Sequence, residues 1–237
     1  MRIFVTAGNT QTPIDRVRCI TNIFTGRTGA SIALEAYRRG HIVTLATSHP
    51  ETVADPTLDA ARWQCLTYRK YDELETLMAG HIGPTKADAV VHCAAVGDFH
   101  AAGIFAPAAG TRFDAETKTW SGGAMLDRAA GKVKSDEPEL WLRLVRAPKL
   151  VDKIRGDWAF RGILVKFKLE VGVNDEQLLA IAEKSRRQSH ADWMVANTLD
   201  DASHWAFFGS ERGYRKVKRA DLAAVLLDAI EGKAPHG

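Results

Sequence analysis

The sequence lacks the features of a membrane or secreted protein. No apolar run approaches the roughly 20 residues that a membrane-spanning helix needs, and the start MRIFVTAG has neither the charged region nor the cleavage site of a secretory signal. The three cysteines, Cys19, Cys65 and Cys93, are scattered and form no CxxC pair, which argues against a disulfide framework or a zinc site. We therefore expect a soluble, cytoplasmic protein in a reducing compartment.

Strong net charge, internal repeats and low-complexity tracts are also missing. The net charge is +3, which is too small to imply nucleic acid and suits a small anionic ligand equally well. The composition, 46% hydrophobic and 26% charged, is that of an ordinary globular protein with a sizeable core. A length of 237 residues fits one large domain or two small ones. We predict a single domain over residues 1–237.

Short β-branched or apolar runs alternate along the chain with amphipathic stretches, which is typical of βαβ units and a parallel sheet. The run at 88–96 is so continuously apolar that it should be a central strand covered on both faces. We expect an α/β fold with a doubly wound, Rossmann-like, mostly parallel sheet that binds its ligand beyond the carboxyl ends of its strands. Strands are predicted over 2–7, 42–46, 64–68, 88–96, 161–171 and 191–197, and helices over 28–40, 71–82 and 174–188.

Two regions depart from this alternation. Residues 100–131 are rich in alanine and glycine and are predicted to form a long flap or excursion. Residues 204–218 have the pattern of a β-hairpin with its turn at 210–213, and a closing helix is predicted over 220–230.

The loop after the first strand is the first functional signal. It runs from Gly8 to about Gly26, whereas strand-to-helix loops usually take about 2–6 residues. Gly26 and Gly29 have no Cβ, so a phosphate could approach backbone N–H groups at the positive end of the next helix, and Gly8 would let a ligand lie over the strand end. The alternative is that these glycines only make turns. Arg18 and Asn22, considered alone, are more typical of solvated loop residues.

The segment CAAVGDF at 93–99 is the second signal, because it follows the predicted central strand. Ala94, Ala95 and Gly97 leave room for a ligand against the backbone, and Asp98 would point a carboxylate into the crevice. An Asp after a strand is often only a helix cap, but its position on the expected ligand side favours the functional interpretation.

The segment GKVKS at 131–135 is the third signal. In an extended segment Lys132 and Lys134 share one face, so both could meet the same polyphosphate. The alternative is an exposed edge strand that its lysines keep soluble, and the segment considered alone favours that alternative.

Taken in order, these segments resemble one family, phosphopantothenate–cysteine ligase, also called phosphopantothenoylcysteine synthetase. The resemblance is carried by VTAGNTQTPIDRVRCITNIFTGRTGA, AAVGDF, KVKS, VKFKLE at 165–170 and VAN at 195–197, and it spans about residues 2–200. The resemblance implies a ligase of coenzyme A biosynthesis that joins 4′-phosphopantothenate to cysteine. A nucleoside triphosphate, ATP or CTP, activates the carboxylate as an acyl-nucleotidylate, and the cysteine amine then displaces the nucleotide.

The resemblance also implies Mg²⁺ on the phosphates, a homodimer, and a stand-alone synthetase that uses no flavin and lacks the decarboxylase domain. The residues that it would place at the nucleotide are Gly8, Gly26, Gly29, Phe167 and Asn197, the last two near the base and sugar.

Further residues are assigned to the second substrate and to the reaction. The pantothenate side would be bound by Arg18, which reaches the neighbouring subunit's site, and by Asn22, Ala94, Ala95 and Asp98. Lys132 matches the lysine expected to be catalytic, with Lys134 beside it, and Asn22 matches the asparagine that processes the intermediate.

Three positions depart from the family's pattern. Phe24 stands where the family usually has a serine that helps to hold phosphate, Asn9 replaces a common glycine, and Ser135 ends a segment in which bacterial members often have a third lysine. These changes leave the choice between ATP and CTP open.

Two other functions fit parts of the sequence. An NAD(P)-dependent reductase of the short-chain type would share the sheet but needs a Tyr-x-x-x-Lys pair on a helix. Tyr214 and Lys218 have that spacing, yet they fall in the predicted hairpin, where the two residues would lie about 13 Å apart at ~3.3 Å per residue. A non-catalytic nucleotide-binding relative is the second alternative, because Phe24 removes a phosphate donor.

Overall fold

The computed structural model describes residues 1–53 and 57–233. The chain divides into two compact units. The first unit comprises Met1–Thr10, Ile23–Val96 and Lys149–Gly237, and the second comprises Gln11–Asn22 and Gly97–Pro148. The prediction of a single domain over 1–237 stays a prediction, and residues 54–56 and 234–237 of that range lie outside the described residues.

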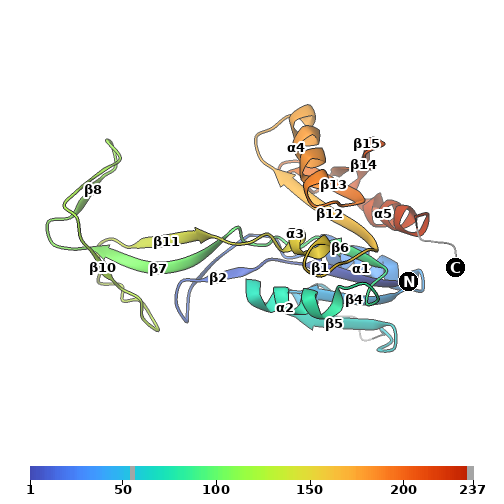
Figure 1. The fold of residues 1–237 in the computed structure, drawn as a ribbon, viewed down its shortest axis with the longest axis horizontal. Helices are drawn as coiled ribbons and strands as arrows, with labels where there is room; N and C mark the ends of the chain where they lie inside the picture. Colours follow the sequence, from blue (N-terminus) through green and yellow to red (C-terminus); the bar gives the residue numbers. More distant parts are fainter. Residues whose placement is uncertain (54–56, 234–237) are drawn as a thin grey trace. The chain divides into compact units, whose positions relative to one another are not determined.

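The first unit is built on an eight-stranded sheet with the order β15-β14-β13-β12-β6-β1-β4-β5 (Figure 1). Six neighbouring strands of this sheet run parallel to one another, in the sheet order β13-β12-β6-β1-β4-β5. Strands β14 and β15 form an antiparallel hairpin at the β13 edge. Numbered along the chain, the six parallel strands have the order 3-2-1-4-5-6 of a doubly wound sheet. This confirms the predicted fold class. The strands are β1 (Arg2–Ala7), β4 (Ile42–Thr47), β5 (Trp63–Thr67), β6 (Ala89–His92), β12 (Ile163–Glu170), β13 (Trp193–Thr198), β14 (Trp205–Ser210) and β15 (Gly213–Lys218).

The predicted helices are confirmed with small shifts at their ends. The predicted strand over 88–96 is shorter in the structure, because the chain leaves the regular ladder after His92. The α-helices of the first unit are α1 (Arg27–Arg38), α2 (Tyr71–His81), α3 (Leu150–Arg155), α4 (Asp175–Gln188) and α5 (Leu222–Glu231), with 3-10 turns η1 (Pro50–Val53) and η2 (Arg219–Asp221).

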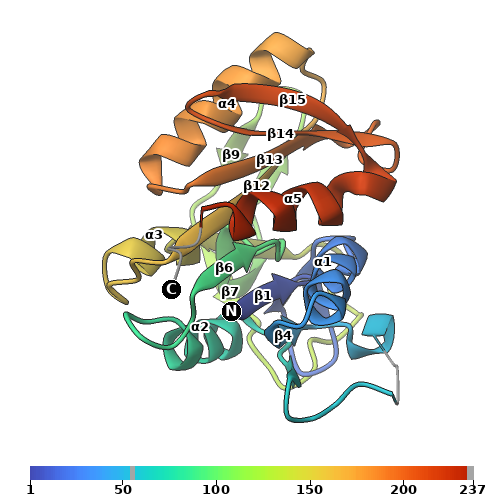
Figure 2. The ribbon, with the colours of Figure 1, turned by 90° about the vertical axis from the view of Figure 1, so that its right-hand side faces the viewer.

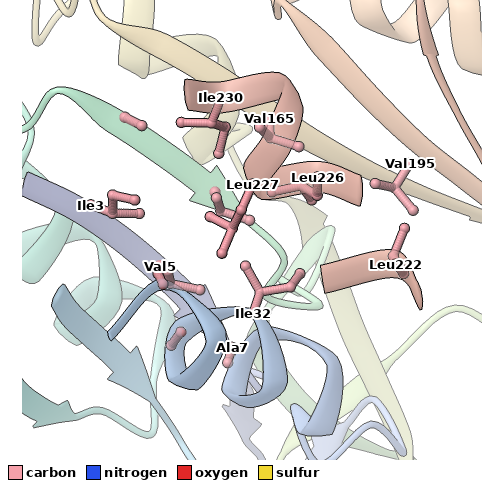
Figure 3. Packing of buried hydrophobic residues seen from close by; sticks show 14 of the residues in the cluster. Ile3, Val5, Ala7, Ile32, Val165, Val195, Leu222, Leu226, Leu227 and Ile230 are labelled. Atoms are coloured by element: carbon pink, nitrogen blue, oxygen red, sulfur yellow. The ribbon is translucent and has the colours of Figure 1, made fainter. Parts of the chain in front are cut away.

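Helices α1 and α5 pack on one face of this sheet (Figure 2). Because side chains alternate along a strand, Ile3 and Val5 of β1 point toward these helices and meet Ile32 of α1 and Leu226 of α5 in one buried cluster (Figure 3). Phe4 points to the opposite face and stacks on His81 at the end of α2, with ring centroids 5.6 Å apart. Each fully buried aliphatic side chain contributes roughly 1.5–3 kcal/mol, so this core holds β1 against α1 and α5.

Helix α4 covers the opposite face near the hairpin. Asn174 and Gln177 form a capping box in which each side chain accepts a hydrogen bond from the other residue's backbone N–H, at 2.9 and 3.1 Å. Leu178 and Ala182 then pack on Met194, one residue beyond the start of β13. The cap fixes where α4 begins, and its apolar stripe fixes which face it buries.

The second unit consists of short antiparallel strands. Its largest sheet has the order β10-β7-β11, and the β7–β11 pair forms a long ribbon (Figure 1). Phe113, Trp120 and Trp141 form an aromatic cluster with ring centroids 4.6–5.2 Å apart. The strands are β2 (Gln11–Pro13), β3 (Cys19–Thr21), β7 (Phe99–Pro107), β8 (Arg112–Asp114), β9 (Thr119–Ser121), β10 (Met125–Asp127) and β11 (Trp141–Arg146).

The excursion predicted over 100–131 is therefore wider than its composition indicated. It takes in 97–148 and also the 11–22 hairpin from the first loop, because β11 supplies the antiparallel partner that β7 needs. Among the residues described, no helix combines the length and the apolar character needed to cross a bilayer.

Candidate functional site

The site in the first unit begins at the amino end of α1. Gly26 is the N-cap residue, with φ of 81°, and no side chain caps the helix. The first turn carries no acidic residue, so no side chain of that turn offsets the partial positive charge of its backbone N–H groups. Such an end is suited to bind an anion.

Gly26 lies directly against Gly8, the first residue after β1. A Cβ at Gly26 would overlap the amide nitrogen of Gly8 and lie 2.8 Å from its Cα. Asn9 fastens the loop here, because its side-chain amide donates to the carbonyl of Phe24 at 2.9 Å, while its backbone N–H donates to Ser48 Oγ at 2.9 Å. These contacts bring the strand end and the helix start together.

Gly29 has a different role from the other two glycines. It lies in α1, and a Cβ there would sit 2.6 Å from the Cβ of Ala7. It is buried and is not among the residues that line the cavity described below. Gly29 therefore allows α1 to pack closely on β1, and its assignment to the nucleotide stays a prediction.

A cavity of about 620 Å³ opens beside the start of α1. It is lined by six of the predicted residues, namely Gly8, Gly26, Ala94, Ala95, Phe167 and Asn197. The described lining also contains three cationic side chains, Arg27, Lys168 and Arg219, and no carboxylate. A cavity with this balance of charge favours an anionic ligand.

The floor of the cavity is the chain that follows β6. The backbone N–H of Ala95 donates to the carbonyl of Gly8 at 2.8 Å, and that of Ala94 donates to Thr6 Oγ1 at 3.2 Å. Thr6 Oγ1 also lies 3.0 Å from Nδ1 of the buried His92, whose pKa is lowered to about 4 by burial, so the ring is neutral at neutral pH. The small residues form a flat shelf because their backbone is fastened to β1.

Another part of the cavity lining comes from the carboxyl-terminal halves of β12 and β13. Phe167 is half-buried and Asn197 is buried, 6% exposed, with its side-chain amide donating to the carbonyl of Thr198 at 3.3 Å. Lys168 also belongs to this part of the lining and forms an ion pair with Glu170 at 2.8 Å. An apolar ring beside a fixed amide suits a base and sugar.

The remaining predicted residues lie in the second unit, where Arg18 joins the GKVKS segment. The Arg18 guanidinium donates to Asp15 at 2.6 Å and to the carbonyl of Val133 at 2.9 Å, while the N–H of Val133 donates to Asp15 at 3.0 Å. Hydrogen bonds from the Arg18 side chain, which have the largest effect, and from backbone N–H groups hold the pKa of Asp15 far below its usual range. Val133 is thereby fixed and buried, and Lys132 and Lys134 on either side of it are exposed.

The structure decides between some interpretations that the sequence left open. Asp98 precedes the strand β7, so the helix-cap interpretation is wrong. Residues 131–135 form no strand, so the edge-strand interpretation of the two lysines is also wrong. Asn22 is half-buried at the end of the β2–β3 hairpin.

Three cationic residues of the cavity were missed from the sequence. Arg27 begins α1, Lys168 lies in β12, and Arg219 lies just after β15. They are far apart along the chain, and only the pairing of the strands places them at one cavity. Arg27 had a usable signal, because it follows the glycine that begins the helix.

The reductase alternative loses its catalytic pair. Tyr214 and Lys218 both lie in β15, paired with Gly209 and Trp205. The Tyr214 hydroxyl donates to Glu183 at 2.9 Å on α4. The pairing of β15 with β14 confirms the strand predicted for these residues. Tyr214 and Lys218 therefore do not share a helix face.

The described side chains can also be compared with the ligands that a Mg²⁺ ion needs. Within 1–53 and 57–233, no group of three or more His, Cys, Asp or Glu side chains could hold a metal ion. The described cavity lining has no carboxylate either, although Mg²⁺ in proteins is usually bound by one or two carboxylates together with substrate phosphates. Among the described residues, the cavity lining therefore offers no carboxylate for a Mg²⁺ ion, and no larger ligand cluster is present.

Comparisons with known proteins identify similar chains. Residues 1–107 match the family model of the DNA/pantothenate metabolism flavoprotein C-terminal domain. The coenzyme A biosynthesis bifunctional protein CoaBC of Thermococcus kodakarensis is 32% identical over 97% of this chain and 51% of its own length. The protein of the same name from Escherichia coli is 28% identical with the same coverage. The chain thus spans about half the length of the curated relatives it matches.

Solved structures are similar to this chain over 98% of its length. The crystal structure of the DNA/pantothenate metabolism flavoprotein from Streptococcus pneumoniae has a TM-score of 0.79 and 25% identity, covering 98% of this chain and 99% of its own. A Cab2 mutant in complex with phosphopantothenate-cysteine shares the fold, with a TM-score of 0.68 and 16% identity over 98% of this chain and 86% of its own. The chain is therefore similar over almost its whole length to the DNA/pantothenate metabolism flavoprotein from Streptococcus pneumoniae and to about half of CoaBC, and residues 1–107 match the DNA/pantothenate metabolism flavoprotein C-terminal domain family.

Proposed function

We propose that this chain is a nucleotide-dependent ligase that joins 4′-phosphopantothenate to cysteine through an acyl-nucleotidylate. The observation that carries the proposal is the uncapped amino end of α1, which faces a cavity with three cations and no carboxylate among its described lining. The similarity to the coenzyme A biosynthesis protein CoaBC supports the same reaction, and a structure of Cab2, whose fold this chain shares, contains phosphopantothenate-cysteine.

In this proposal the triphosphate lies along the cavity in the first unit. The phosphates occupy the end of α1 at Gly26, where backbone N–H groups and the bare Gly8 surface allow close approach. The base and sugar lie toward Phe167 and Asn197. Either ATP or CTP meets these requirements.

The carboxylate substrate takes the shelf formed by Ala94 and Ala95. A carboxylate is a poor acyl donor because its leaving group is an oxide, and attack on the α-phosphate replaces that group with a nucleotide. The developing charge on departing pyrophosphate needs cations, and we assign this role to Lys132 with Lys134. Asn22 is assigned to the step in which the cysteine amine attacks, and Arg18 and Asp98 to substrate binding.

Mg²⁺ enters as part of the substrate in this proposal. Because the described residues offer no carboxylate site, the ion arrives on the triphosphate and is held by its phosphates.

We further propose that the second unit pairs with a second copy of this chain. Several large apolar side chains are exposed on its three-stranded sheet, including Phe99 at 50%, Leu126 at 42% and Leu144 at 43%. Strands β10 and β11 are the two edges of that sheet, and a symmetric dimer would cover the same patch on both copies. Leu144→Glu should shift the protein to a monomer in light scattering, and an unchanged mass would refute the pairing.

The proposed reaction is tested by mixing the protein with 4′-phosphopantothenate, cysteine, Mg²⁺ and either ATP or CTP, and measuring pyrophosphate. Release that requires 4′-phosphopantothenate supports the ligase. Tight triphosphate binding without any release would instead favour the non-catalytic relative, and binding of a nicotinamide nucleotide in its place would favour the reductase.

A further inference from the structure

Arg219 occupies an unusual position at the cavity. It is the first residue of η2, between the last strand of the hairpin and α5. Its backbone N–H donates to the carbonyl of His204 at 2.8 Å, which fixes the main chain here. The side chain is half-buried and lines the cavity.

The guanidinium of Arg219 points at the start of α1. One of its Nη atoms donates to Thr28 Oγ1, in the first turn of that helix. Arginine carries five N–H donors in a fixed planar arrangement, so one bond to Thr28 orients the group and leaves other donors for a ligand. The side chain is therefore held beside the same backbone N–H groups that form the anion-binding end of α1.

Arg219 has no carboxylate partner among the residues described, and this separates it from the other arginines of similar burial. Each of those has an Asp or Glu within ion-pair distance, and they are Arg39, Arg62, Arg128, Arg155 and Arg186. A cation removed from water is costly unless an anion accompanies it. The protein supplies that anion at five half-buried or buried arginines and omits it at the one that lines the cavity.

The nearby thiol does not replace the missing anion. Burial raises the pKa of Cys93 to about 12 even though Arg219 acts in the opposite direction, so the thiol stays neutral at neutral pH. Burial lowers the pKa of Arg219 itself, but a guanidinium remains protonated in proteins. The positive charge is therefore present and uncompensated until a ligand arrives.

We infer that Arg219 is a phosphate-binding residue of the nucleotide site, which holds a phosphate of the triphosphate between its guanidinium and the backbone N–H groups at the start of α1. This inference rests on the proposed function for the identity of the ligand. Thr28 acts as the positioning partner, since its hydroxyl accepts the bond that aims the guanidinium.

The test compares binding of ATP and CTP with binding of the matching nucleosides, in the absence of 4′-phosphopantothenate and cysteine. Arg219→Gln should weaken the triphosphate that binds the wild type on the order of ten- to a hundred-fold, as expected for lost hydrogen bonds to a charged group. Binding of the nucleoside should be unchanged, because it carries no phosphate. Arg219→Lys keeps the charge and should recover part of the loss.

The matched control is Arg215→Gln, because Arg215 is an exposed arginine of β15 with no role in the cavity. Unchanged triphosphate binding by Arg219→Gln, or equal weakening of the nucleoside and the triphosphate by both Arg219 variants, would overturn the inference. A wild type that binds triphosphate and releases no pyrophosphate would overturn the ligase proposal alone. A wild type that binds neither triphosphate would overturn both.

Discussion

Replacing Gly26 with alanine tests the close approach on which the cavity is built. Gly26 has φ of 81°, a left-handed conformation that costs a residue with a Cβ roughly 1–2 kcal/mol. The added Cβ would also overlap backbone atoms of Gly8 and lie 3.0 Å from the carbonyl carbon of Ala7. None of these atoms belongs to a flexible side chain, so the end of β1 or the loop must move, at a further cost of about 1–3 kcal/mol. We expect a total destabilisation of about 2–5 kcal/mol.

Gly40→Ala is the matched control for this prediction. Gly40 has φ of 90°, but a Cβ there would meet nothing within 4 Å. It should therefore lose only the conformational part, about 1–2 kcal/mol. Urea unfolding followed by circular dichroism gives both free energies of unfolding, and triphosphate binding should fall only in Gly26→Ala. Equal destabilisation of the two variants would refute the argument that Gly26 exists to let the helix start touch Gly8.

The remaining predictions concern catalysis and pH. Lys132→Gln should lower the rate of pyrophosphate release by on the order of a hundred-fold or more without unfolding the protein. The control Lys184→Gln changes an exposed lysine of α4 and should leave that rate unchanged. Near-normal turnover by Lys132→Gln would remove Lys132 from the mechanism. Asn22→Asp should let activation proceed but slow the step after it, so the acyl-nucleotidylate should accumulate in quenched samples, and failure to trap any would count against this role. The pKa of Glu183 is lowered from 4.5 to about 2, chiefly by Arg186. A carboxyl group whose pKa is lower in the folded than in the unfolded protein stabilises the fold at pH values above its unfolded pKa, and this stabilisation is lost as the pH falls to its folded pKa. Between pH 4.5 and about pH 2, the free energy of unfolding should therefore fall less steeply in Glu183→Gln than in the wild type. Parallel curves for the two proteins would contradict the ion pairing.

The parallel sheet could be predicted from the sequence because each of its strands has a local signal. The runs at 2–7 and 161–171 are rich in apolar or β-branched residues, and the helices between such runs show one apolar face. The carboxyl ends of parallel strands meet at one edge, so Gly8 and Ala94 could be placed together without any structure, whereas Asn197 was assigned through the resemblance alone.

The second unit could not be predicted in the same way. Its strands are short, and β2–β3 joins β7–β11 from a distant part of the chain, so no local periodicity links them. The ion pair of Asp15 and Arg18 is local, but its contact with Val133 joins distant parts of the chain and has no signal in the sequence. Arg219 was missed for a related reason. Whether an arginine has a carboxylate partner depends on the three-dimensional structure, and the spacing of residues in the sequence does not show it.

The central claim is that this cavity activates a carboxylate by transferring a nucleotide to it. The most direct measurement is the stoichiometry of the complete reaction, with pyrophosphate and the amide product quantified together by mass spectrometry. We expect one phosphopantothenoylcysteine for each pyrophosphate released, and no pyrophosphate when 4′-phosphopantothenate is omitted. Amide formation accompanied by inorganic phosphate in place of pyrophosphate, or no amide with either triphosphate, would contradict it.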